Sequence, residues 1–154
     1  MQEAIIEERE QGGAHFPLTD KNALGPLRRE IKDDFARVGA DPSVVFECLV
    51  SVTEACTNAL EHGQSDAEGG RQEPRVTWTI EPELALFTVR DFSARRWSER
   101  RAPIDLTEPA AGGYGIGIMR KLMDEVCIET DTKGTTVRLT KRLQEPRSLS
   151  SRKP

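Results

Sequence analysis

The sequence predicts an α+β fold, a two-layer α/β sandwich in which helices cover one face of a mixed, mostly antiparallel sheet. Three features predict it: two long helical segments follow one another, two pairs of alternating strands come later, and a short helix separates the pairs. The chain has 154 residues, of which 36% are hydrophobic and 31% charged, and this suits one domain with a single core.

The N-terminal part holds two strand candidates, residues 3–9 and 14–18, before the first helix. Thr19 or Asp20 can cap this helix, which ends near Gly39. Its apolar residues recur at spacings of three and four, which places them on one face: Leu24, Leu27, Ile31, Phe35 and Val38.

A second helix begins with Asp41 as N-cap and Pro42 in the first helical position. It ends at about residues 62–63. One stripe of this helix is apolar, and a second stripe is polar, consisting of Glu47, Ser51, Glu54, Asn58 and Glu61.

Strand-like alternation of apolar and polar residues marks four further segments, which are 75–80, 84–89, 126–130 and 135–139. Short turns join the members of each pair. Residues 92–111 are polar and rich in arginine, and they predict a long loop of the kind that is often functional. A short helix is expected over 116–123, after the sequence GGYG.

Three parts of the chain follow from this pattern. Residues 1–13 are expected to form an N-terminal extension or edge strand, and residues 14–143 the folded domain. Residues 144–154 are polar and are expected to be a disordered tail.

Composition narrows the class of protein. The net charge of −4 shows no basic surface for nucleic acid, so we expect no direct nucleic-acid partner. The three cysteines are odd in number and lack a CxxC spacing, so we expect reduced core thiols rather than disulfides or a zinc site. The acidic start is not typical of a signal peptide, and no unbroken apolar run approaches a membrane span. A cytoplasmic protein without a membrane partner is expected.

Glu54 and Asn58 are the first candidate site residues. Their spacing of four places both side chains on one helix face. An amide oxygen is a suitable ligand for Mg²⁺, and a carboxylate one turn away can accept a proton from an attacking hydroxyl. A solvated helix face gives the same pattern, so the pair alone is not specific.

Further candidates lie at strand and helix ends. Asp91 ends a strand, where its carboxylate can accept the exocyclic amine of adenine or simply form a turn. The glycines of residues 112–115 precede a helix whose free amides suit phosphate, although a flexible hinge would also use them. Thr135, with Thr136 as second choice, opens the last strand, where a hydroxyl can reach a nucleotide or belong to a plain hairpin.

In this order and spacing, the segments resemble the GHKL ATPase superfamily over roughly residues 14–143. TEACTNALEHG is similar to its N box, and GGYGIGIMRKLMDEV to its G2 box in the anti-sigma factor serine kinases of bacterial partner-switching systems. The resemblance implies a Bergerat fold that binds ATP and Mg²⁺. It also implies a STAS-domain anti-anti-sigma protein as substrate, a sigma factor as second partner, and a possible homodimer.

The resemblance assigns roles to the matching residues. It makes Glu54 the general base, Asn58 the Mg²⁺ ligand and Asp91 the adenine-binding carboxylate. Phosphate contacts fall to Gly113 and Gly115, and Thr135 supplies the hydroxyl near the adenine pocket.

One departure from the family pattern follows Asp91, where Ser93 and Arg95 replace two glycines. Their side chains can narrow an adenine pocket, so an ATP-independent partner-switching module is the alternative function. A sensor histidine kinase fragment is a third possibility, but neither His15 nor His62 lies in a helical hairpin of the required kind. The arginines of the long loop can contact phosphate or an acidic partner.

Overall fold

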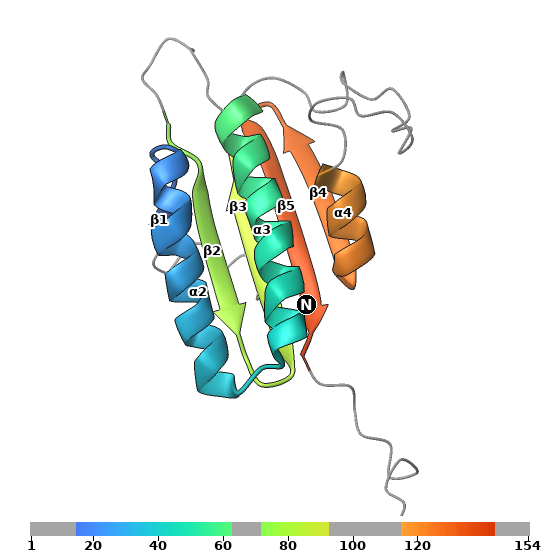
Figure 1. Cartoon of the computed structure of the whole chain (residues 1–154). Coiled ribbons are helices and arrows are strands. Elements are labelled where there is room, and N and C mark those ends of the chain that lie inside the picture. The colour runs from blue at the N-terminus through green and yellow to red at the C-terminus, as the bar shows by residue number, and fades with distance from the viewer. Residues whose placement is uncertain (1–14, 63–71, 93–114, 144–154) are drawn as a thin grey trace, which may run out of the picture.

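The computed structural model describes residues 15–62, 72–92 and 115–143, which form two layers (Figure 1). Helices α2 (Leu24–Val38), α3 (Pro42–His62) and α4 (Gly115–Leu122) cover one face of a five-stranded sheet. A short 3-10 turn, η1 (Lys21–Ala23), leads into α2. The predicted two-layer α+β sandwich is confirmed. The predicted strand at 3–9, the loop beyond residue 92 and the tail at 144–154 lie outside the described residues.

The sheet has the strand order β1-β2-β3-β5-β4. Its strands are β1 (Phe16–Pro17), β2 (Arg75–Ile80), β3 (Leu84–Arg90), β4 (Glu125–Asp131) and β5 (Gly134–Arg142). Every pairing between these described strands is antiparallel. The C-terminal strand β5 therefore lies between β3 and β4, and it brings the two predicted strand pairs into one sheet.

The core fills the space between the two layers. Ala85, Phe87 and Val89 alternate along β3 and are buried toward the helices. The Phe35 ring of α2 lies 6.1 Å from the Phe87 ring, in a tilted arrangement typical of aromatic pairs. Burying a side chain of this size contributes about 2–3 kcal/mol to folding.

Local signals fix the ends of both long helices. Gly39 adopts the left-handed conformation with φ 66° and donates its amide to the last turn of α2. The Asp41 carboxylate accepts the backbone amide of Ser43 at 2.9 Å and thereby caps α3. Asp20 does the same for η1, by accepting the Asn22 amide at 2.8 Å. The predicted cap at Asp41 is confirmed. Asp20 caps the short turn η1 rather than α2 itself, whose N-cap Ala23 makes no side-chain hydrogen bond.

Helix α3 is the central helix of the core. By length and composition alone, its segment Pro42–Glu61 would suffice to cross a membrane. Its apolar residues have another place in this fold, because Cys48, Val52 and Cys56 are buried against the other elements. The high hydropathy of α3 is that of a core helix.

Two of the three cysteines lie in the core, as predicted, but the third does not. Cys48 and Cys56 are completely buried. Cys127 is only half-buried, because it belongs to the residues of β4 that alternate away from the helices. The prediction of a core position is therefore wrong for Cys127.

Candidate functional site

The predicted site residues gather at one end of the sandwich. The C-terminal half of α3, the end of β3 and the starts of α4 and β5 meet there (Figure 1). These segments carry Glu54, Asn58, Asp91, Gly115 and Thr135. Gly113 lies outside the described residues.

The start of α4 lies directly against the polar stripe of α3. A methyl group added to Gly115 would lie 3.0 Å from Oε2 of Glu54 and 3.2 Å from Nδ2 of Asn58. Asn58 is buried and Glu54 is half-buried at this contact. The first residue of α4 therefore lies against the Glu54 and Asn58 side chains, and the N-terminus of a helix is the end that suits anions.

Asp91 is locked to the start of β5. It is 3% exposed, and its Oδ1 accepts the backbone amide of Thr135 at 3.1 Å. Its own backbone amide donates to the Thr135 carbonyl at 2.9 Å. This pair of hydrogen bonds fixes both the backbone and the carboxylate of Asp91, so the orientation of the carboxylate is set before any ligand binds.

Gly134 allows this close approach. A Cβ at this position would lie 2.1 Å from the Asp91 carbonyl oxygen, and the residue has φ 155°. Both features exclude a side chain. The KGTT sequence therefore contributes its glycine as well as the Thr135 amide to the geometry around Asp91.

Thr135 and Thr136 point to opposite faces of the sheet. Thr135 is 1% exposed, and its hydroxyl lies 3.4 Å from that of Thr130. The Thr136 hydroxyl instead accepts Nη1 of Arg90 at 2.7 Å, on the face turned away from the helices. Thr135 is thus the threonine on the side of Asp91.

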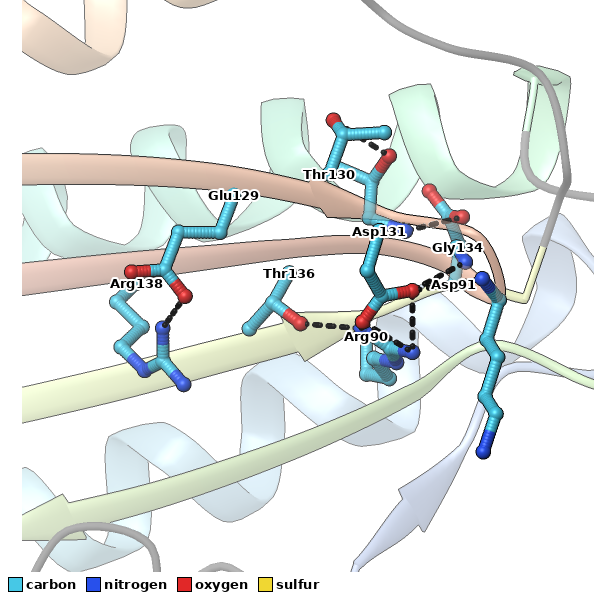
Figure 2. A network of polar contacts seen from close by, with 10 residues as sticks. Arg90, Asp91, Glu129, Thr130, Asp131, Gly134, Thr136 and Arg138 are labelled. Carbon is cyan, nitrogen blue, oxygen red and sulfur yellow. Dashed lines mark hydrogen bonds and ion pairs between the residues drawn. The ribbon is translucent and has the colours of Figure 1, made fainter. Parts of the chain in front are cut away.

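A polar network supports the turn between β4 and β5 on that outer face (Figure 2). Asp131 accepts the amides of Lys133 at 2.7 Å and Gly134 at 2.9 Å, and its carboxylate pairs with the Arg90 guanidinium at 3.3 Å. The Lys133 amide, followed by the Arg90 side chain, lowers the pKa of Asp131 below its ordinary value.

Phe92, the residue after Asp91, belongs to the same outer face. The guanidinium carbons of Arg75 and Arg90 lie 4.9 Å and 5.3 Å from the centre of its ring. Arg75 and Arg90 are register partners on the side opposite the buried Val76 and Val89. The bulk of Phe92 is therefore directed away from the side of the sheet that carries the helices.

One contact that was not predicted holds the other end of α4. Nζ of Lys141 donates to the Glu47 carboxylate at 2.8 Å and to the Leu122 carbonyl at 2.6 Å. These bonds join β5, α3 and the C-terminal end of α4. The sequence did carry a signal for a partly buried lysine, because Lys141 lies on the same face of β5 as the buried residues Val137 and Leu139.

The donor set around Asn58 fits Mg²⁺ held largely by a nucleotide. Mg²⁺ usually keeps waters and phosphate oxygens and needs only one or two protein ligands. The amide of Asn58 and the carboxylate of Glu54 can supply these. In the described ranges, no group of three or more His, Cys, Asp or Glu side chains could hold a metal ion by itself.

The profile of the histidine kinase-like ATPase domain matches residues 16–141. The chain belongs to this family. The match spans the site residues on α3, β3, α4 and β5.

Relatives within this histidine kinase-like ATPase family include bacterial regulators. The anti-sigma F factor of Bacillus subtilis is 33% identical over 131 residues, which cover 76% of this chain and 88% of the relative. The serine-protein kinase RsbW of Bacillus pumilus is 28% identical over 132 residues, which cover 80% and 81% of the two chains.

Solved structures share the fold. The structure of the RsbU and RsbW domains of Rv1364c from Mycobacterium tuberculosis superposes with a TM-score of 0.63 at 23% identity. The match covers 86% of this chain but only 33% of that longer chain. The histidine kinase domain of a blue-light activated kinase from Erythrobacter litoralis gives a TM-score of 0.51 at 21% identity, covering 79% of this chain and 64% of that one.

Proposed function

We propose that the protein is an anti-sigma factor serine kinase. It binds MgATP, phosphorylates a serine of a STAS-type anti-anti-sigma protein, and sequesters a sigma factor when free of that protein. Relatives named anti-sigma F factor and serine-protein kinase support the proposal. The phosphate added to the STAS protein would weaken its binding through charge and desolvation.

The close contact of Gly115 with Glu54 and Asn58 is the observation that carries this proposal. It places the start of a helix, a carboxylate and an amide around one point. The amides at the start of α4, with Gly113 and Gly115, would bind the phosphates. Asp91, oriented by Thr135, would accept the adenine amine, and the Thr135 hydroxyl would lie near the base.

Glu54 would act as the general base for phosphoryl transfer. It would accept the proton of the serine hydroxyl while that oxygen bonds to the γ-phosphorus and the bond to the ADP oxygen breaks. Asn58 would hold Mg²⁺, which neutralises charge on the phosphates. Glu54 and Asn58 are one helical turn apart, so the α3 helix sets their separation.

An ATP-independent binding module is the second candidate function, favoured by the loss of two glycines after Asp91 at Ser93 and Arg95. The direction of Phe92 favours the kinase instead. Its ring lies beside Arg75 and Arg90 on the outer face, so its bulk does not narrow an adenine pocket on the helix side of Asp91. A cytoplasmic location and a homodimer belong to the same proposal, and sedimentation would measure the dimer.

The first test is calorimetric titration with MgATP and MgADP. We expect micromolar binding by the wild type, loss of binding in Asp91→Ala, and loss of the Mg²⁺ dependence in Asn58→Ala. Asn22→Ala and Asp33→Ala, at exposed positions on η1 and α2, are matched controls and should bind normally. Phosphotransfer to purified STAS proteins follows. Absence of wild-type binding up to millimolar nucleotide would leave the binding module as the function.

A further inference from the structure

Arg90 immediately precedes Asp91 and occupies the opposite face of the sheet. Its Nη1 donates to the Thr136 hydroxyl at 2.7 Å and to Oδ2 of Asp131 at 3.3 Å. Its Nη2 lies 3.3 Å from both Asp131 oxygens. One guanidinium thus contacts the last residue of β4 and the third residue of β5, on either side of the turn that joins them (Figure 2).

Asp131 connects Arg90 to the backbone of the turn. The Asp131 oxygen that accepts the amides of Lys133 and Gly134 is Oδ1, which also receives Nη2 of Arg90. The Gly134 backbone is therefore held from the outer face by the same carboxylate that Arg90 orients. The next amide along the chain, that of Thr135, donates to Asp91 on the other face.

These contacts form a continuous chain of hydrogen bonds from one face of the sheet to the other. Arg90 binds Asp131, Asp131 binds the Gly134 amide, and the next amide, that of Thr135, binds Asp91. Asp91 is in turn the covalent neighbour of Arg90. Gly134 has no room to shift toward β3, because Asp91 already occupies the space beside it. A change in the turn position would therefore move the Thr135 amide and with it the Asp91 carboxylate.

The neighbours of Arg90 restrict its guanidinium. Arg75 lies directly opposite on β2, and like charges in register repel one another. The Phe92 ring accepts both guanidinium groups, and Asp131 lies beside that of Arg90. Arg90 is thus directed toward the turn, where its planar fork suits a carboxylate.

Building on the proposed function, we propose that Arg90 is a positioning residue for adenine recognition. It acts through Asp131 to place the Thr135 amide, which orients the Asp91 carboxylate for the base. The role concerns recognition of the base rather than of the phosphates, because this chain of hydrogen bonds ends at Asp91 and does not include Glu54, Asn58 or α4.

Arg138 offers a matched control on the same face of the sheet. Its Nη1 pairs with Oε2 of Glu129 at 3.0 Å, with side-chain exposures of 26% and 65%. The Arg90 and Asp131 side chains have similar exposures of 20% and 57%. The Arg90 pair joins β3 to β4 and the Arg138 pair joins β5 to β4, but of the two pairs only that of Arg90 contacts the turn that leads to Thr135.

The experiment measures MgATP and MgGTP affinity and thermal unfolding for the wild type and five variants: Arg90→Met, Arg90→Lys, Asp131→Asn, the double variant Arg90→Met with Asp131→Asn, and Arg138→Met. Arg90→Met and Asp131→Asn should weaken MgATP binding about tenfold and reduce the preference for ATP over GTP. Arg90→Lys should recover part of both. Because Arg90 acts through Asp131, the double variant should bind MgATP with about the same affinity as whichever single variant binds it less tightly.

The preference for ATP over GTP separates positioning from stability. A merely structural role for Arg90 would lower the unfolding temperature and reduce both affinities by one factor, which would overturn the inference. An effect of Arg138→Met on ATP preference equal to that of Arg90→Met would also overturn it. Asp131→Asn is nearly isosteric, so it provides the test if Arg90→Met does not fold. Absence of wild-type nucleotide binding would overturn the proposed function and the inference together, whereas wild-type binding with unaffected variants would overturn the inference alone.

Discussion

Lys141 and Glu47, 94 residues apart, form an ion pair of 2.8 Å in which the lysine side chain is only 13% exposed. The same ammonium donates to the Leu122 carbonyl at the C-terminal end of α4. A cation at this end of a helix is favourable for the helix dipole as well as for the carbonyl. The pair therefore anchors α4, whose other end lies against Glu54 and Asn58.

Replacing Lys141 with methionine should destabilise the fold and loosen α4. The Glu47 carboxylate and the Leu122 carbonyl lose a partner in a partly buried place, at a cost of about 1–3 kcal/mol. Urea unfolding measures this loss, and hydrogen exchange should become faster at the α4 amides. Arg37→Met is the control, because the Arg37 side chain is 78% exposed in its pair with Asp34 and should contribute at most about 0.5 kcal/mol. Equal losses in the two variants would contradict the anchoring role.

Gly134→Ala should be strongly destabilising. Its new methyl group would meet the Asp91 carbonyl oxygen at 2.1 Å in a backbone conformation that favours glycine, so we expect a loss of about 3 kcal/mol or more. Gly39→Ala is the control for backbone strain without a steric clash, because Gly39 has φ 66° and a methyl group added there would have no atom within 4 Å. It should lose only about 1 kcal/mol in urea unfolding. A Gly134→Ala loss as small as that of Gly39→Ala would argue against the tight contact with Asp91.

Gly115→Ala should affect binding more than stability. The added methyl group meets the tips of the Glu54 and Asn58 side chains, which can move aside, so the unfolding free energy should change by less than about 1 kcal/mol. MgATP affinity should fall about tenfold because these side chains are displaced. Gly25→Ala in α2 has open space around it and should leave binding unchanged. Calorimetry that finds equal affinities for wild type and Gly115→Ala would count against this geometry.

The stability conferred by Asp131 should depend on pH. Because folding lowers its pKa from the ordinary value of 3.8, the ionised carboxylate stabilises the fold above that value. The contribution is lost as the pH falls through the lowered folded-state pKa. Asp131→Asn should therefore be less stable than wild type at about pH 7, and the difference should shrink below about pH 4. Urea unfolding at a series of pH values measures the difference. A gap that is constant with pH would contradict the assignment.

Thiol reactivity should distinguish Cys127 from the other two cysteines. Burial raises the pKa of Cys48 to about 12, and it raises the pKa of Cys56 further. Thiolates are the reactive form, so both should resist a disulfide reagent in the folded protein. Cys127 is half-buried and should react first. Cys127→Ser should abolish labelling of the native protein, and labelling that persists at the wild-type rate would contradict the buried positions of Cys48 and Cys56.

Local structure was predictable because its signals are local. Gly39 ends α2 through its left-handed backbone, and Asp41 caps α3 through its own side chain. The sequence pattern predicted β2, β3 and β4 to within one residue at each end, whereas β5 continues three residues beyond its predicted end. The spacing of four likewise predicted that Glu54 and Asn58 share a helix face, and α4 then covers that face at Gly115.

Contacts that depend on strand order were not predictable in the same way. Nothing in the sequence around Arg90 indicates that β5 pairs with β3, so its bonds to Thr136 and Asp131 appear only in the folded sheet. The collision that requires Gly134 depends on the same pairing. Lys141 was closer to prediction, because a lysine at a core-facing position of a strand needs a buried partner. Glu47 on the polar stripe of α3 is that partner.

The pairing of β3 with β5 also has a consequence for how the protein is made. Residues 84–90 pair with 136–142, so the central part of the sheet can form only after the last strand has been synthesised. Helices α2 and α3 and the β2–β3 hairpin need no later residues to take their local shape. On the ribosome the nascent chain therefore leaves the backbone hydrogen-bonding groups along one edge of β3 without their partner strand until β5 emerges. The site around Asp91 should be among the last parts of the protein to assemble, since long-range pairing must first overcome the entropy of loop closure.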